Sequence, residues 1–325
     1  MNGPSQGRPS TVPISLGGAS RVVFLGSQDK HIYAIDADTG AFVSPWSPIP
    51  DLGAMVQAAP SGMFTAFGGA YNYILVGTRD SANPNKFFVL NVADGSTAYA
   101  VNGAPFGRIG IISGQAAVDY VTRRVYFTSY AFGLAPDNNT AWCVSLDTGA
   151  VVWARPYGDI AAGPTLSRDK TRLYIGTNAG EVKALSTTDG LQAWSYPTGD
   201  GPVKGFVTID RLSPTNDLYF ATTNKVWSLA DTSGTPPVFR WARPLNSPST
   251  PVFLTGSLHV YVGAGDGKLY RLSSIDGSDA PGIPATFPLV LGDGSAAVGS
   301  PTIDTRDGFV YVGTDAGVVY ATQIP

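Results

Sequence analysis

The amino-acid sequence predicts an all-β fold, a single β-propeller of seven four-stranded blades. Three observations carry this prediction: a strand-like phrase recurs seven times, helical periodicity is absent, and Gly and Pro are abundant. The 39 Gly and 25 Pro residues make up about 20% of the 325 residues, and both residue types punctuate tight turns. An apolar content of 43% is enough for a large core, which excludes a disordered chain.

The recurring phrase alternates β-branched or aromatic residues with small ones and then meets Gly, Asn or Asp. This is the pattern of a strand followed by a tight turn. Successive copies start 42 to 52 residues apart, a period that suits four-stranded units. The copies begin at Val22, Ile74, Val125, Leu173, Leu218, Val260 and Val310. Arranged radially, such units cover one another's faces and leave few open edges.

The fourth unit shows the expected strands in order. Strands are expected over 163–166, 173–177 and 181–185, and a fourth run ends at Trp194. Turns are expected at 178–180 and 189–190, where Asn, Asp and Gly gather.

The domain prediction is a flexible segment or linker over 1–10 and the propeller over 11–325. Residues 11–16 are expected to form the innermost strand of the first blade. The last unit starts near Ser300 and runs out of strands at Ala321. The last blade is therefore expected to be incomplete or to be closed by the segment upstream of Thr11.

Composition narrows the classes of function. A net charge of −3 and a pI near 5.3 argue against nucleic-acid binding, which needs a basic face. No stretch approaches the roughly 18 apolar residues of a membrane span, and the N-terminal residues lack the apolar core of a signal peptide. The low charged fraction of 14% favours an extracytoplasmic location, whether periplasmic, cell-surface or secreted. The single cysteine, Cys143, excludes an internal disulfide and is expected to be buried.

Several units carry parts of one motif, A-x-D-x-x-T-G-x-x-x-W. The matching residues are Ala34, Asp36, Thr39 and Gly40, with Trp46 displaced by two; Thr148, Gly149 and Trp153; and Ala184, Gly190 and Trp194. In this the chain resembles the PQQ-like, or quinoprotein-type, β-propeller repeat family. The resemblance implies that tryptophans at the outer strands dock one blade on the next, where a large ring fills the wedge between sheets. The residues expected in this role are Trp46, Trp153, Trp194 and Trp241.

The resemblance also raises a quinone (PQQ)-dependent dehydrogenase as an alternative function. Many such enzymes frame the quinone with a vicinal cysteine pair and a calcium ion, and Cys143 stands alone. The compact acidic segment 36–40 lacks the later Glu of a calcium loop and is expected to be a turn. Neither PQQ nor calcium is therefore expected as a cofactor.

Other propeller enzymes, such as lyases or hydrolases, use a general base, commonly a histidine. The histidines, His31 and His259, fall in different blades, and neither has an acidic orienting partner visible in the sequence. No G-x-S-x-G elbow is present. We therefore expect a noncatalytic protein.

The favoured function is an interaction scaffold, as in family members similar to the outer-membrane assembly lipoprotein, which hold protein partners. Two turns expand into loops over 79–86 and 130–139, in adjacent blades, on the face expected to carry the blade-connecting loops. The candidate partner-binding residues are Arg79, Asn83, Arg108, Tyr130, Phe132, Asn138, Tyr157, Asp159, Asp200 and Lys204. A carbohydrate ligand is a second alternative, because exposed aromatic residues among Asn, Asp and Gln also suit sugars.

Overall fold

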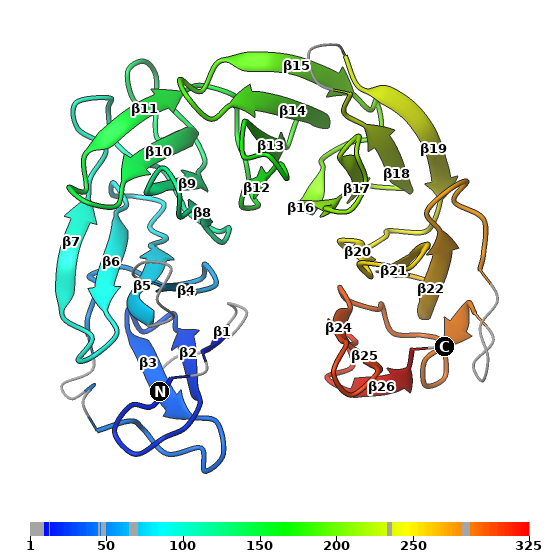
Figure 1. Ribbon diagram of the computed structural model, residues 1–325, viewed down its shortest axis with the longest axis horizontal. Coiled ribbons are helices and arrows are strands. Elements are labelled where there is room, and N and C mark those ends of the chain that lie inside the picture. Colours follow the sequence, from blue (N-terminus) through cyan, green and yellow to red (C-terminus); the bar gives the residue numbers. More distant parts are fainter. Residues whose placement is uncertain are drawn as a thin grey trace. The chain divides into compact units, whose positions relative to one another are not determined.

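The computed structural model describes residues 10–12, 14–44, 46, 50–64, 71–232, 236–280 and 287–324. These residues form 26 strands, β1 to β26, and no helix (Figure 1). The strands assemble into seven antiparallel sheets, each built from consecutive strands. The predicted fold class, an all-β propeller, is confirmed. No helix in this part of the chain could cross a membrane.

The chain divides into two compact units. Unit 1 comprises Met1–Leu166 and Thr187–Leu191, and unit 2 comprises Ser167–Ser186 and Gln192–Pro325. The boundary between the units falls within the fourth sheet. The first strand of this sheet, 165–166, and the turn 187–191 belong to unit 1, and its other strands belong to unit 2.

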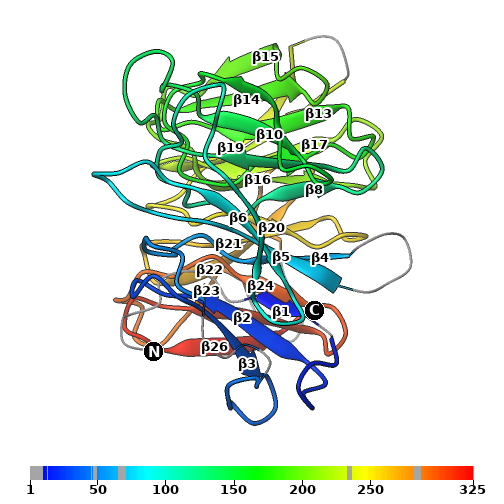
Figure 2. The ribbon, with the colours of Figure 1, turned by 90° about the vertical axis from the view of Figure 1, so that its left-hand side faces the viewer.

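Unit 1 holds the first three sheets. The first consists of β1 (Ser10–Val12), β2 (Val22–Gly26) and β3 (Ile32–Asp36), and β2 and β3 lie side by side in both views (Figures 1 and 2). The second consists of β4 (Ser61–Phe64), β5 (Tyr71–Gly77), β6 (Phe87–Asn91) and β7 (Thr97–Val101). The third consists of β8 (Ala117–Asp119), β9 (Arg124–Thr128), β10 (Ala141–Ser145) and β11 (Val151–Arg155).

The remaining sheets follow in chain order. The fourth consists of β12 (Thr165–Leu166), β13 (Arg172–Gly176), β14 (Glu181–Ser186) and β15 (Gln192–Pro197). The fifth consists of β16 (Lys204–Asp210), β17 (Asp217–Ala221), β18 (Lys225–Ala230) and β19 (Val238–Pro244). The sixth consists of β20 (Val252–Phe253), β21 (His259–Gly263), β22 (Lys268–Ser273) and β23 (Leu289–Val290), and the seventh of β24 (Thr302–Asp304), β25 (Phe309–Gly313) and β26 (Val319–Gln323).

The first and last sheets differ from the predicted four strands. Among the described residues each has three strands, whereas the other five sheets have four. In the first sheet the outer strand is reduced to a bridge between Ile35 and Phe42. Prolines at positions 45, 48 and 50 follow, and proline has no amide to donate to a ladder. The innermost strand spans Ser10–Val12 instead of the expected 11–16.

The core consists of apolar clusters between consecutive sheets. In unit 1, Phe24 packs with Ile74 and Val76 between the first and second sheets. In unit 2, Tyr174 and Phe220 belong to the cluster between the fourth and fifth sheets. Each such side chain contributes about 1.5–3 kcal/mol by leaving water.

The second strand of a sheet is more deeply buried in the inner sheets than in the first and last sheets. Strands β9, β13, β17 and β21 each bury four consecutive residues, because both faces of their sheets are covered. Strands β2 and β25 bury only alternate residues. The first and last sheets therefore each have one well covered face and one more open face.

Candidate functional site

Three segments of unit 1 meet at one edge of the second and third sheets, and we call them the loop cluster. They are 79–86 between β5 and β6, 103–111 between β7 and β8, and 129–140 between β9 and β10. The amide of Asn85 donates to the Ile109 carbonyl at 2.9 Å, and that of Tyr130 donates to the Ile111 carbonyl at 3.0 Å. The expanded loops of two adjacent sheets are thus tied to the connection between those sheets.

An ion pair between Arg108 and Asp137 fastens the longest loop. The Arg108 guanidinium donates to Asp137 Oδ2 from Nε (2.9 Å) and Nη2 (2.6 Å), and the Arg108 amide donates to Oδ1 at 2.7 Å. These hydrogen bonds hold the pKa of Asp137 below its usual range. The same guanidinium lies 4.6 Å from the centre of the Phe132 ring, a cation–π contact. Arg108 therefore orders both the acidic and the aromatic residue of the loop.

Further hydrogen bonds brace the backbone of this loop. Asn139 Nδ2 donates to the Phe106 carbonyl at 2.6 Å, and the Phe132 amide donates to the Asp137 carbonyl at 3.0 Å. At the tip the side chain of Leu134 is 90% exposed. Sequence reasoning missed this leucine, although a lone large apolar residue among Gly, Ala and Pro in a long loop is a usable signal. A rigid loop carrying an exposed leucine beside Phe132 and Arg108 has the composition of a contact surface.

The shorter loop, 79–86, is held mainly by hydrogen bonds among its own residues. The Asp80 carboxylate accepts hydrogen bonds from the amides of Ala82 (2.8 Å) and Asn83 (3.1 Å), which lower its pKa. The buried Asn85 accepts from the Asp80 amide at 2.6 Å and donates back to its carbonyl at 2.9 Å. Of the predicted residues here, Asn83 donates to Asp80 and Arg79 donates to Gln57. These bonds fix the shape of the loop.

Eight of the ten predicted partner-binding residues lie in unit 1, on or beside the loop cluster. Asp159 accepts from the Ala131 amide at 2.9 Å, and the Tyr157 amide donates to Thr140 Oγ1 at 3.0 Å. Both therefore brace the longest loop from the connection that follows β11. Tyr130 and Asn138 are half-buried within that loop.

Asp200 and Lys204 lie in unit 2 and serve turns there. Asp200 Oδ2 accepts from Thr222 Oγ1 (2.5 Å) and from the Asn224 amide (3.0 Å). Lys204 Nζ donates to Ser247 Oγ at 2.9 Å, and burial lowers the pKa of this lysine. The structure gives both side chains local partners.

The four predicted tryptophans are buried at the outer strands, with 3–6% of each residue exposed. Three indoles donate from Nε1 to a backbone carbonyl of the next sheet: Trp46 to Val92 (2.8 Å), Trp153 to Thr187 (3.1 Å) and Trp241 to Ser274 (2.9 Å). Tyr99 does the same through its hydroxyl, at 2.9 Å from the Leu146 carbonyl. Sequence reasoning missed Tyr99, although it stands four residues after Gly95 as Trp153 stands after Gly149.

Each of these rings lies on a four-residue turn that we call a docking turn. The accepting carbonyl belongs to its first residue, and its fourth residue is a glycine with φ between +69° and +74°. A Cβ on that glycine would lie only 2.5–3.0 Å from the docked ring, so glycine is required twice, for the backbone and for the contact. The four docking turns are 92–95, 146–149, 187–190 and 274–277.

Trp194 is an exception, because it donates to a buried carboxylate. Its Nε1 lies 3.2 Å from Asp231 Oδ1, and Asp231 Oδ2 accepts from the Tyr174 hydroxyl at 2.7 Å. Arg172 Nε lies 3.5 Å from the same oxygen. Burial and the bond to Asp231 raise the pKa of Tyr174. Asp231 also borders a polar cavity of about 400 Å³ within unit 2.

The two histidines considered as general bases, His31 and His259, lie beside different kinds of neighbour. His31 Nδ1 lies 2.7 Å from the Asp29 carbonyl oxygen and 3.5 Å from Asp29 Oδ1, so an acidic side chain that was not picked out in the sequence lies near it. The two residues share a tight turn, so one residue of separation hid the pairing. His259 lies 3.1 Å from the guanidinium of Arg271 and has a lowered pKa through burial and that charge. Burial also raises the pKa of Cys143 to about 12.

The acidic segment considered for calcium forms a turn. Asp36 Oδ1 accepts from the amides of Asp38 (2.8 Å) and Thr39 (3.3 Å), and Asp38 pairs with Arg21. In the described part of the chain no three His, Cys, Asp or Glu side chains gather as a metal site would require.

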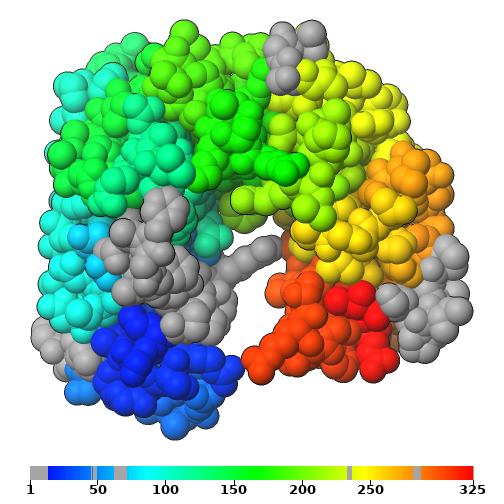
Figure 3. All heavy atoms as spheres, in the orientation of Figure 1, coloured from blue at the N-terminus to red at the C-terminus, as the bar shows by residue number. Residues whose placement is uncertain are grey.

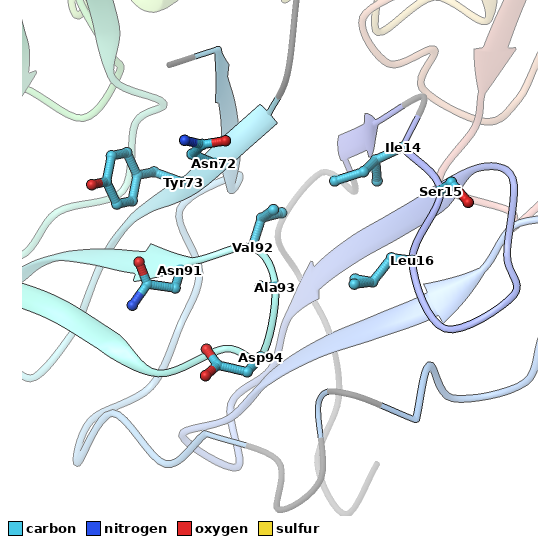
Figure 4. Close-up of a pocket in the computed structure, with 9 residues that line it drawn as sticks. All are labelled: Ile14, Ser15, Leu16, Asn72, Tyr73, Asn91, Val92, Ala93 and Asp94. Atoms are coloured by element: carbon cyan, nitrogen blue, oxygen red, sulfur yellow. The ribbon is translucent and has the colours of Figure 1, made fainter.

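A hollow of about 470 Å³ lies in unit 1 between the first and second sheets. Ile14 and Leu16 line one side, and Asn72, Val92 and Asp94 line the other (Figure 4). Tyr73 also lines this hollow, with its ring pointing away from Ile14 (Figure 4). Asp94 Oδ1 accepts from the amide (2.9 Å) and the hydroxyl (2.6 Å) of Ser96.

Comparisons with known proteins agree with this architecture. The family described as "Outer membrane protein assembly factor BamB" matches residues 135–325. No curated protein matches the chain in sequence. The crystal structure of BamB from Moraxella catarrhalis has a TM-score of 0.63 and 19% identity, covering 93% of this chain and 79% of that one. The computationally designed Ika8 protein has a TM-score of 0.66 and 15% identity, covering 93% and 80%. At these identities the two structures share the fold of this chain.

Proposed function

The chain belongs to the family of the outer membrane protein assembly factor BamB, and from this membership we propose that it is a noncatalytic scaffold that binds a protein partner. The contact surface in this proposal is the loop cluster of unit 1. The observation that carries it is the braced loop 129–140, which exposes Leu134 two residues along the chain from Phe132, the ring that Arg108 covers. Exposed apolar residues on a rigid loop have a use when a partner covers them.

Rigidity supports a binding role for this loop. A loop that is ordered before contact loses little conformational entropy on binding, so more of the contact energy appears as affinity. The Arg108 guanidinium, 56% exposed, keeps donors available beside its contact with Asp137. Arginine and aromatic residues are enriched at protein interfaces, and Leu134 adds exposed apolar surface to them here.

Protein partners are favoured over carbohydrates by the same residues. At the loop cluster the Arg108 guanidinium lies over the Phe132 ring, which leaves less of that aromatic face open to a sugar. The family name, an assembly factor for outer membrane proteins, agrees with an extracytoplasmic protein partner. We therefore place this chain outside the cytoplasm.

Point variants at the loop tip provide the test. The envelope fraction of the source organism would be passed over immobilised wild type, and a retained partner would be purified for calorimetry. We expect Leu134→Asp to weaken its affinity at least about tenfold, which is about 1.4 kcal/mol. Leu212→Asp is the matched control, because Leu212 is an exposed leucine (60%) in a turn of unit 2.

Two results would count against the proposal. Equal affinity of wild type and Leu134→Asp would remove the loop tip from the contact. A glycan array with a hit that Leu134→Asp abolishes would replace the protein partner with a carbohydrate. A melting temperature shared by all three proteins is the required check on folding.

A further inference from the structure

The first sheet carries a fifth docking turn, over residues 37–40. Its hydrogen bonds repeat those of the others: Gly40 donates to the Asp36 carbonyl at 2.9 Å, as Gly95 donates to Asn91 at 2.8 Å. Gly40 also has the same backbone conformation, with φ of +74°. The Ala37 carbonyl stands where the Val92 carbonyl accepts the Trp46 indole.

This turn differs from the other four in what lies on it. A Cβ on Gly40 would meet no heavy atom within 4 Å, whereas at each of the other docking turns it would meet an aromatic ring. No hydrogen bond reaches the Ala37 carbonyl from the described residues. The turn has the shape and the acceptor of an aromatic docking site, but none of the described residues places a ring on it.

The surface beside the turn is aromatic and exposed. Phe42, two residues after Gly40, is 56% exposed and lies 5.5 Å from the Tyr33 ring, centre to centre. Val23 and Leu25 are only half-buried, on the more open face of the first sheet. Residues of this sheet form part of the surface of unit 1 (Figure 3, blue).

We propose that the turn 37–40 is a binding site for a tryptophan side chain presented by an extended segment of a partner protein. The chain provides its own template, because its docked rings come from outer strands and most carry an N–H that meets the carbonyl. The indole N–H would donate to the Ala37 carbonyl and its ring would lie over Gly40, flanked by Phe42. Each of the other four docking turns receives a ring from the preceding sheet, and this turn would receive the partner's ring in the same way.

The area available decides how strong this binding is. One aromatic side chain buries about 150–250 Å², far below the roughly 800 Å² per partner of a stable complex. The site alone therefore cannot hold a second copy of the chain, and we expect isolated tryptophan to bind in the millimolar range. It would act as one contact within a larger interface. This inference does not depend on the loop cluster.

The test uses the whole chain labelled with ¹⁵N and the probe N-acetyltryptophanamide at up to about 10 mM. We expect saturable shifts of the amide signals of Gly40 and Ala37, and weaker effects with N-acetylleucinamide. The variant Gly40→Ala places a methyl group where the ring would lie, so its dissociation constant should rise at least about tenfold. Gly308→Ala is the matched control, since Gly308 has the same φ of +74° and open space around it.

Three outcomes would overturn the proposal. The Gly40 signal could stay unmoved by the tryptophan probe, or it could move equally in wild type and Gly40→Ala. It could also shift with protein concentration alone, which would assign the turn to contact with a second copy. Equal melting temperatures of the two alanine variants exclude a general loss of structure.

Discussion

Trp153 in unit 1 and Trp194 in unit 2 occupy the same place in consecutive sheets but end on different acceptors. Trp153 donates to the backbone carbonyl of Thr187 and lies on Gly190. Trp194 donates to the buried carboxylate of Asp231. Both rings lie beside a tyrosine of their own sheet, with ring centres 6.0 Å apart in each case.

The difference separates a neutral acceptor from a charged one. The Thr187 carbonyl also accepts from Arg124 Nη1 (3.2 Å) and from the Tyr126 hydroxyl (3.5 Å), but it carries no charge. The Asp231 carboxylate also serves Tyr174 and Arg172, and removing one partner of a buried charge leaves the others with an unmet cost. The second site should therefore be the more sensitive to mutation.

The largest expected effect comes from removing the rings. Trp153→Ala should lower the free energy of unfolding by about 3–5 kcal/mol through the cavity it leaves. Trp194→Ala should cost about 1–3 kcal/mol more, because a buried carboxylate that loses a donor is left at a higher cost than a carbonyl that loses one. Urea denaturation of both variants measures the difference. Equal losses would show that the carboxylate is no more demanding than a carbonyl.

A smaller effect is expected from the glycines of the docking turns. Gly190→Ala should cost about 1–2 kcal/mol for the positive φ and about 1–3 kcal/mol more because its Cβ would lie 2.5 Å from the Trp153 ring. Gly40→Ala should show only the backbone cost, since its Cβ meets open space. Matched urea titrations test the contrast. A Gly40→Ala variant as destabilised as Gly190→Ala would mean that the turn at 37–40 is already covered.

Interactions that repeat from sheet to sheet could be predicted from the sequence, whereas interactions that occur once could not. The seven phrases predicted the seven sheets. Trp153 and Trp194 could be named because each follows a glycine by four residues, and Trp241 because it opens the same Trp-Ala-Arg-Pro segment as Trp153. Asp231 was not found, because no motif in the sequence around it indicates that its carboxylate accepts from an indole 37 positions away.

The loop cluster shows the same limit. The long loops were visible as insertions, but the Arg108–Asp137 pair joins residues 29 positions apart in two segments that no periodicity relates. That pair decides which side chains the loop exposes. Tyr130 and Phe132 were named from the sequence, whereas Leu134 joined the candidate surface only once the fold had placed the two segments together.

The smallest expected effect tests whether Tyr99 belongs with the tryptophans. Tyr99→Phe keeps the ring on the docking turn 146–149 and removes only the hydroxyl that donates to the Leu146 carbonyl, so the cost should be about 0.5–1.5 kcal/mol. Tyr99→Ala should cost several times as much, because the cavity term then adds to the lost bond. The ratio of the two losses, measured in the same urea series, separates the contribution of the ring from that of its hydrogen bond. If both variants lost the same small amount, the ring would contribute little, and Tyr99 would not be the counterpart of Trp153. If Tyr99→Phe alone lost as much as Trp153→Ala, the hydroxyl would dominate, and ring packing would not be what the docking turns have in common.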